Sequence, residues 1–366
     1  MIKFPIEGYG SLNLLDITLL FSIISGTLLI FQKRNWEDFR EYLLSNSLFN
    51  GTGLFLLAGL IALFVNWDIN WIKSLSVFKS FFVLPILFTI IVKFFIEKKK
   101  VKPQSFFHCY LGYSLVLSLL AIFYKLFQIT TFDNRVRLFF DSPNQLAISL
   151  SLGILSSLIF WNPFKNKKFL FPTLILAIGL LLTKSVGAIL ATLLVTVLIY
   201  SPQKTLKTKQ VFQVFLVLSF SLVLLILFLT PALEKLNYNP FLNKNSLDSR
   251  LVIHLSTTKI ISDNFLSGIG FANFQKKYLA KQTQFPPYPQ WAVPHSHNLF
   301  TQIWVSCGIF GLIFWVFLLF KKTLSEKKLF WKVSVYFILY FLIHGLVDVS
   351  IWNNDQALFF WFIFLL

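Results

Sequence analysis

The stretch NLFTQIWVSCGIFGLIFWVFLLF, residues 298–320, decides the fold class, because it carries no charged side chain and is long enough to cross a bilayer. Similar apolar runs recur along all 366 residues, of which 56% are hydrophobic and only 13% are charged. An average soluble domain carries roughly 25% charged residues. One globular core cannot bury this excess of apolar side chains. The composition predicts an all-α, polytopic membrane protein and excludes a soluble enzyme, a disordered chain and a disulfide-stapled secreted domain.

About eleven apolar segments are predicted to form a transmembrane helical bundle, which makes residues 1–366 a single integral membrane domain. The eighth and ninth segments are separated by a long hydrophilic loop, 231–297, which we expect to be partly helical and to carry part of the functional site. The predicted spans are 12–31, 48–65, 81–96, 106–127, 145–161, 169–183, 185–200, 211–230, 298–320, 330–347 and 351–366.

The basic residues predict the orientation of the bundle. Apart from four lysines near helix ends, the connections after the odd-numbered spans hold seventeen lysines and arginines. The N-terminal segment and the other short connections hold five. Basic loops stay in the cytoplasm, so we predict an external N-terminus, a cytoplasmic C-terminus and an external 231–297 loop. The net charge of +18 then follows from topology and does not indicate a nucleic-acid partner.

Polar side chains that differ from ordinary loop residues all fall on this predicted external face. Three of the five arginines lie there, although the positive-inside rule disfavours them, and arginine is suited to diphosphate or carboxylate groups. The fifth, seventh and ninth helices also begin at this face, with their positive dipole ends toward it. We therefore predict an anion-binding site made from Arg135, Arg137, Asn144, Lys184, Ser185, Arg250, His295, His297, Asn298 and Asp348.

Each of these features also has an ordinary structural interpretation. Arg135 and Arg137 could anchor the chain at lipid headgroups, and Arg250 could pair with a neighbouring acid on a helix over about 247–262. His295 and His297 could be interfacial residues or metal ligands, but we expect no metal, because no accompanying cluster of ligands is evident in the sequence. The convergence of these residues on one face favours the functional interpretation.

In their order along the chain, these motifs resemble the O-antigen ligase and O-antigen polymerase superfamily of bacterial envelope proteins. The resemblance covers most of the chain from Arg135 onward. It rests on RVRLFFDSPNQLA at 135–147, TKSVGAILA at 183–191, SRLVIHLSTTKIISDNFLSGIGFANF at 249–274, HSHNLFTQIWVSCGIFGL at 295–312 and HGLVDVSIWNNDQALFFW at 344–361.

The resemblance implies roles for individual residues. Arg250 corresponds to the family arginine thought to hold the diphosphate, and His297 to the proposed catalytic histidine. Arg135 stands where the family often has an arginine before its Asn-Pro-Asn segment. The family commonly has Ser-Arg-Gly where this chain has Ser185-Val186-Gly187, and Lys184 could supply the missing positive charge. His295, Asn298 and Asp348 are expected to support the site.

The resemblance further implies a multi-pass glycosyltransferase of the bacterial cytoplasmic (inner) membrane, with its active face in the periplasm and no metal or other cofactor. The donor would be a glycan on a polyprenyl (undecaprenyl) diphosphate carrier, and the acceptor a hydroxyl of another glycan or of a lipid A core. A polymerase using the same donor, a lipid-linked saccharide transporter and a non-catalytic carrier-binding protein remain alternatives. The absence of a GxxxxGK[ST] loop argues against an ATP-driven pump.

Overall fold

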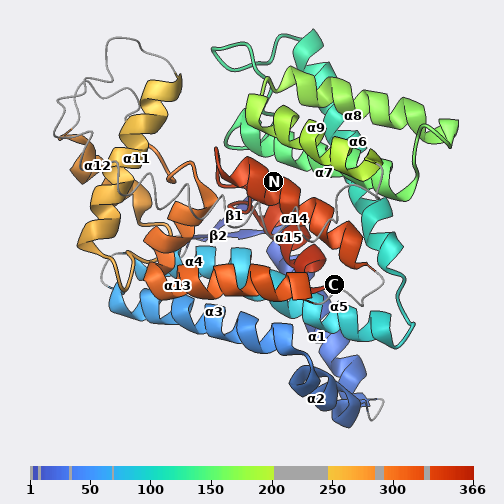
Figure 1. Ribbon diagram of the computed structural model, residues 1–366, viewed down its shortest axis with the longest axis horizontal. Coiled ribbons are helices and arrows are strands. Elements are labelled where there is room, and N and C mark those ends of the chain that lie inside the picture. The colour runs from blue at the N-terminus through green and yellow to red at the C-terminus, as the bar shows by residue number, and fades with distance from the viewer. Residues whose placement is uncertain are drawn as a thin grey trace.

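The computed structural model describes residues 3–6, 10–32, 35–67, 70–201, 246–284, 292–324 and 330–366. These residues are helical except for loops and one short antiparallel ribbon (Figure 1). The ribbon pairs β1 (Lys3–Ile6) with β2 (Gly10–Asn13), in a register that places Lys3 opposite Asn13. The all-α expectation thus holds for the bundle, with this ribbon as a small departure before the first helix.

The apolar segments predicted from sequence coincide with helices wherever the structure describes them. The segment 211–230 lies outside the described residues, as do Pro286, Pro287 and Pro289 of the long loop. The described helices are α1 (Leu14–Gln32), α2 (Trp36–Ser45), α3 (Ser47–Val65), α4 (Trp71–Phe78), the π-helix η1 (Lys79–Val83), α5 (Leu84–Glu97), α6 (Pro103–Leu126), α7 (Pro143–Phe160), the 3₁₀ turn η2 (Lys167–Phe169), α8 (Leu170–Leu182), α9 (Val186–Tyr200), α11 (Ser246–Asp263), α12 (Phe274–Gln282), α13 (Leu299–Leu324), α14 (Trp331–Gly345) and α15 (Asn354–Leu365).

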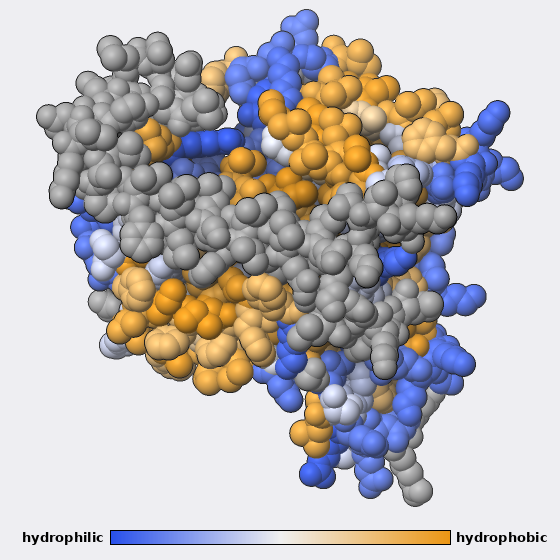
Figure 2. Space-filling view, in the orientation of Figure 1, coloured by the Kyte–Doolittle hydropathy of each residue, from blue (hydrophilic) through white to orange (hydrophobic). Residues whose placement is uncertain are grey.

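Six described helical stretches are long and apolar enough to cross a membrane, where α4, η1 and α5 count as one stretch, Trp71–Glu97. Helices α9 and α14 are shorter apolar helices. The predicted total of about eleven spans therefore stays a prediction. Many large hydrophobic side chains are exposed, among them Leu57 and Phe64 on α3 and Phe171 and Leu174 on α8. Figure 2 shows hydrophobic residues gathered in broad areas of one face, with hydrophilic residues mainly around the outline of the molecule in this view. This distribution suits a protein whose sides meet lipid.

The bundle has two helical groups that meet at α14 and α15. In one group α7 packs against α6, α8 and α9, and in the other α13 packs along α3 (Figure 1). Helix α14 contacts α9 and α13, and α15 contacts α5 and α7. The C-terminal helices are almost wholly buried. The loop that joins α14 to α15 is consequently held where both groups can contribute side chains.

Helix α13 is broken at Gly308, and the chain after α11 docks into the break. Gly308 has φ 70° and ψ −176°, a conformation that is essentially restricted to glycine. The Ile269 N–H donates to Val305 O (2.7 Å), and the Ile309 N–H donates to Phe265 O (3.0 Å). The backbone after α11, at Phe265 and Ile269, therefore ties this helix to α13.

Candidate functional site

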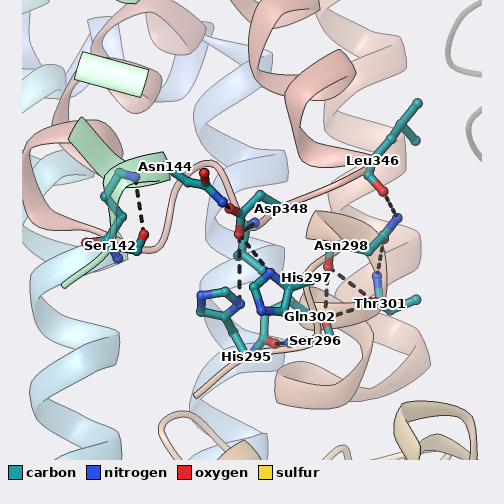
Figure 3. A network of polar contacts seen from close by, with 12 residues as sticks. Ser142, Asn144, His295, Ser296, His297, Asn298, Thr301, Gln302, Leu346 and Asp348 are labelled. Carbon is teal, nitrogen blue, oxygen red and sulfur yellow. Dashed lines mark hydrogen bonds and ion pairs between the residues drawn. The ribbon is translucent and has the colours of Figure 1, made fainter. Parts of the chain in front are cut away.

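The HSHN loop is held rigidly at the start of α13. The side chain of Asn298 caps the helix, because its Oδ1 accepts the backbone N–H groups of Phe300 and Thr301, each at 3.0 Å. Its Nδ2 donates to the Leu346 carbonyl at 3.1 Å, which ties the cap to the end of α14 (Figure 3). The Ser296 N–H donates to Gln302 Oε1 at 2.8 Å. The predicted supporting residue Asn298 is thus part of the frame that places the two histidines.

Asp348 lies opposite both histidines, just beyond the C-terminus of α14. Its Oδ1 is 3.4 Å from His297 Nδ1 and 3.9 Å from His295 Nδ1. The two imidazole rings are edge to face, with centroids 4.4 Å apart, and both face the carboxylate (Figure 3). His297 has φ +53°, which is uncommon for a residue other than glycine. Such backbone conformations often occur at functional sites.

Asn144 and Arg135 connect to the same carboxylate from the other helical group. Asn144, in the first turn of α7, donates from Nδ2 to Asp348 Oδ2 (2.7 Å) and accepts from Arg135 Nη2 at its Oδ1 (2.6 Å). Arg135 Nε also donates to the Thr183 carbonyl at 2.7 Å. Ser142 caps the N-terminus of α7, since its Oγ accepts the Gln145 N–H. The network therefore joins the segments before α7, after α8 and after α14.

Ionisation in the cluster is set by burial and by mutual charge. Burial alone would raise the pKa of the Asp348 carboxyl, but the polar contact with His297 and the charges of His295, His297 and His344 outweigh it. The pKa of Asp348 therefore lies well below its ordinary value. Burial lowers the pKa of His295 to about 4, against the opposing effect of Asp348. At neutral pH, Asp348 is a carboxylate beside a neutral His295.

Arg250 lies on α11, near two further histidines, His254 and His344, that adjoin this cluster. Burial, with additional contributions from His297 and Arg250, lowers the pKa of His254 to about 4. Arg250 also lies within electrostatic range of His344 on α14. Its half-buried guanidinium makes no hydrogen bond or ion pair with the described residues. The salt bridge of the ordinary interpretation is therefore not found in the described part of α11.

The buried histidines predict a specific pH dependence of stability. Because the folded-state pKa values of His254 and His295 lie near 4, below the ordinary 6.5, the unfolded chain binds more protons between these values. The melting temperature should therefore fall as the pH decreases from about 6.5 to 4, and the low pKa of Asp348 adds a loss only below this window. His254→Leu should flatten this pH dependence in thermal unfolding.

The matched control is His108→Leu, because His108 is exposed on α6 and lies outside the cluster. We expect its melting curve to keep the wild-type dependence on pH. An unchanged pH dependence in His254→Leu would contradict the assignment of a buried, neutral His254.

A cleft of about 1280 Å³ opens beside the histidines. Its wall includes His295, His297 and Asn144, together with aromatic and amide-bearing side chains from α4, from η1, and from the segments at the starts of α4, α7 and α15. These other side chains include Trp71, Phe81, Phe139, Phe140, Trp352, Asn70, Asn353 and Asn354. A concave surface with aromatic faces and a few convergent polar groups is typical of a small-molecule site. Arg135, Arg137 and Arg250 do not line the cleft.

The remaining predicted residues lie at the margin of the cluster. Arg137 and Lys184 are exposed, and no described side chain pairs with them. Ser185 is buried before α9, and its N–H donates to Thr183 Oγ1 at 3.2 Å. Val186, at the position of the family's arginine, is 68% exposed. A cation at position 184 and one at position 186 would thus both project from the surface.

Sequence reasoning did not assign His254 and His344 to the site. Four of the five histidines of the chain affect the ionisation of Asp348 or of one another, and His108 is the exception. Gly187 also belongs to this neighbourhood, since a Cβ placed on it would lie 3.5 Å from His344 Cδ2. The usable sequence signal was the four-residue spacing of Arg250 and His254, which places both on one helix face.

Comparison with known proteins gives one family match. Residues 171–316 match the family model described as O-antigen ligase. This match supports the resemblance to the O-antigen ligase superfamily. The matched region holds Lys184, Ser185, Arg250, His295 and His297. A search among curated proteins gave no match.

The residues that complete the cluster lie on either side of the matched region. Arg135 and Asn144 precede the O-antigen ligase match, and Asp348 follows it. The hydrogen bonds of Asn144 to Arg135 and Asp348 join them to the histidines of the matched part. The family resemblance is thus supported, and the apolar helices indicate a multi-pass membrane protein.

Proposed function

We propose that this protein transfers a glycan from a polyprenyl (undecaprenyl) diphosphate carrier to an acceptor hydroxyl, at the outer face of the bacterial cytoplasmic membrane. The observation that carries the proposal is the His297–Asp348 pair beside the cleft. His254 interacts electrostatically with His297 on one side and with Arg250 on the other. A base, a carboxylate partner and a permanent cation are the groups that displacement of a diphosphate requires. The N-terminus would lie outside and the C-terminus in the cytoplasm.

His297 would act as the general base. Since its Nδ1 faces the Asp348 carboxylate, the ring would carry its proton on Nδ1 and leave Nε2 to accept the proton of the acceptor hydroxyl. As the acceptor oxygen bonds to the anomeric carbon, the carbon–oxygen bond to the diphosphate breaks and polyprenyl diphosphate leaves. A single displacement inverts the anomeric centre. The step consumes no ATP and needs no metal.

The arginines would hold the donor. Arg250 would neutralise the departing diphosphate, since its guanidinium is free of ion pairs with the described residues and arginine binds phosphate oxygens in a fork. Arg137, Lys184 and Ser185 would attract or contact the same anion from the neighbouring loop ends. Arg135 and Asn144 already bond to each other and to Asp348, so their contribution would be to position that carboxylate.

The aromatic and amide-rich cleft would take the saccharide. The faces of Trp71 and Trp352 can cover the apolar side of a sugar ring, and Asn353 and Asn354 can bond to its hydroxyls. A ligase would attach a finished glycan to another glycan or to a lipid A core, and a polymerase would extend a carrier-linked chain. Both reactions use the same donor site, so the size distribution of products separates them.

Substitution of Arg250 tests the donor-binding part of the proposal. Charged hydrogen bonds contribute about 1.5–3 kcal/mol, so Arg250→Ala should lower kcat/KM for the carrier-linked donor by about tenfold to a hundredfold. Arg250→Lys should recover part of this loss, because it restores the charge but not the fork. The measurement is initial-rate transfer in lipid vesicles at varied donor concentration.

Arg40→Ala is the matched control, because Arg40 is an exposed arginine on α2. It should leave kcat/KM unchanged. A wild-type kcat/KM in Arg250→Ala would refute the role of Arg250 in holding the diphosphate.

A further inference from the structure

His295, His297 and Asp348 together could hold a metal ion, a capacity that the proposed reaction does not use. One ligand atom from each of His295, His297 and Asp348 lies within 4.8 Å of the other two. Two buried nitrogens, His295 Nδ1 and His297 Nδ1, have no hydrogen-bond partner among the described residues. Buried polar atoms of this kind call for an explanation, and one explanation is a ligand that bonds to them.

One ligand separation equals that of a zinc site, and a second is about 0.5 Å longer. With bonds of about 2.0–2.1 Å in tetrahedral geometry, two ligand atoms on one zinc ion lie about 3.4 Å apart. Asp348 Oδ1 is 3.4 Å from His297 Nδ1 and 3.9 Å from His295 Nδ1. Two imidazole nitrogens and one carboxylate oxygen form a donor set that suits zinc and its neighbours in the transition series better than it suits magnesium or calcium.

The surrounding groups already orient these ligands. Asp348 Oδ2 accepts from Asn144 Nδ2 at 2.7 Å, and Oδ1 accepts the Val349 N–H at 2.8 Å, which leaves Oδ1 a second lone pair. The histidines flank Ser296, whose N–H donates to Gln302 Oε1. Second partners of this kind fix metal ligands and raise affinity. The carboxylate is therefore already oriented for an ion to bind.

We propose that His295, His297 and Asp348 form an inhibitory binding site for zinc or a similar divalent transition-metal ion. An ion on His297 Nδ1 would take the place of the proton there and of the contact with Asp348, and the neutral ring would then carry its proton on Nε2. His297 could then no longer accept the proton of the acceptor hydroxyl. The inhibition rests on the proposed function, whereas the binding does not.

Zinc binding is measured first, on the purified full-length protein after removal of metal with EDTA. Isothermal titration with Zn²⁺ should show one site per chain, and Mg²⁺ should show none at the same concentrations. Co²⁺ should bind the same site and give a visible spectrum without a thiolate band. A Cys109→Ser background removes the exposed thiol beside His108, which could bind metal on its own.

The variants separate this site from adventitious binding. His295→Ala and His295→Gln should abolish the titration, and Asn144→Ala should weaken it by about 10–100-fold, as loss of a second-shell partner does. His108→Ala is the matched histidine control and should bind like the parent. Circular dichroism and melting temperature identify any variant that fails to fold. Unchanged zinc affinity in both folded His295 variants would refute the site.

The activity measurement tests the inhibitory role. Transfer should fall in proportion to occupancy of the zinc site and return fully on addition of EDTA. Stimulation by zinc, or loss of transfer in EDTA, would overturn inhibition. Transfer that never occurs, with the zinc site intact, would refute only the glycosyltransferase proposal. Transfer accompanied by zinc binding that ignores the His295 substitutions would refute only this inference.

Discussion

Replacing His297 with alanine is expected to lower kcat for glycan transfer by about two to four orders of magnitude, the usual contribution of a general base. The reason is the position of His297, which lines the cleft and whose Nδ1 lies 3.4 Å from Asp348 Oδ1. Donor binding should survive, because Arg250 lies on a different element, α11. The measurement is single-turnover transfer with saturating carrier-linked donor.

A second variant separates chemistry from folding at this position. His297 has φ +53°, and asparagine adopts the left-handed region more readily than alanine. His297→Asn should therefore retain the wild-type melting temperature and still lose transfer. His108→Ala should retain both, because that ring is exposed on α6. Full kcat in folded His297→Asn would contradict the role of His297 as base.

The largest effect on stability is expected for Gly308→Ala. A Cβ at this position would lie 1.8 Å from the Leu266 carbonyl oxygen, a backbone atom that cannot yield as a side chain can. The φ of 70° and ψ of −176° add about 1–3 kcal/mol of strain for any other residue. The substitution should therefore lower the melting temperature markedly and separate α11, with Arg250, from α13. Thermal unfolding and limited proteolysis between α11 and α12 measure both effects.

Gly112→Ala is the control for this substitution. Gly112 lies within α6, and a Cβ there would meet no atom within 4 Å. Alanine should be neutral or should stabilise the helix by about 0.5–1 kcal/mol. A melting temperature of Gly308→Ala equal to that of Gly112→Ala would mean that the docked backbone at α13 does not hold the loop as described.

The helices could be predicted from sequence because their signal is local. A run such as 106–127 is long, apolar and preceded by lysines, and the structure has α6 there from Pro103 to Leu126. The N-cap at Ser142, with Pro143 in the first turn of α7, is likewise a local feature of the sequence. The break in α13 was not predicted, because the φ of Gly308 depends on a carbonyl from residue 266, far away in the chain.

The site could be predicted in part. Residue type and predicted topology brought His297, Arg135, Asn144 and Asp348 to one face, and the structure brings these four into one connected network. The contact between Asn144 and Asp348 spans 204 residues of sequence. No spacing rule indicates such a pair, so the sequence suggested donor binding for Asn144, whereas the structure shows an amide already bonded at both ends.

His254 was overlooked because a histidine in an amphipathic helix is usually unremarkable in sequence. Its importance depends on burial and on the approach of α11 to the HSHN loop, both of which are tertiary. The cleft likewise depends on tertiary structure, since its aromatic side chains come from α4, η1, the segment before α7 and the segment before α15. Each of these aromatic residues would be read in the sequence as a membrane-interface residue.

The central claim is that this protein breaks the bond between glycan and carrier. The most direct test incubates the purified protein in vesicles with a polyprenyl diphosphate-linked oligosaccharide and an acceptor, and measures released polyprenyl diphosphate and glycosylated acceptor together. We expect the two products in equal amounts, with neither formed by His297→Asn. Movement of intact carrier-linked glycan across the vesicle membrane, without release of polyprenyl diphosphate, would contradict the account and indicate a transporter.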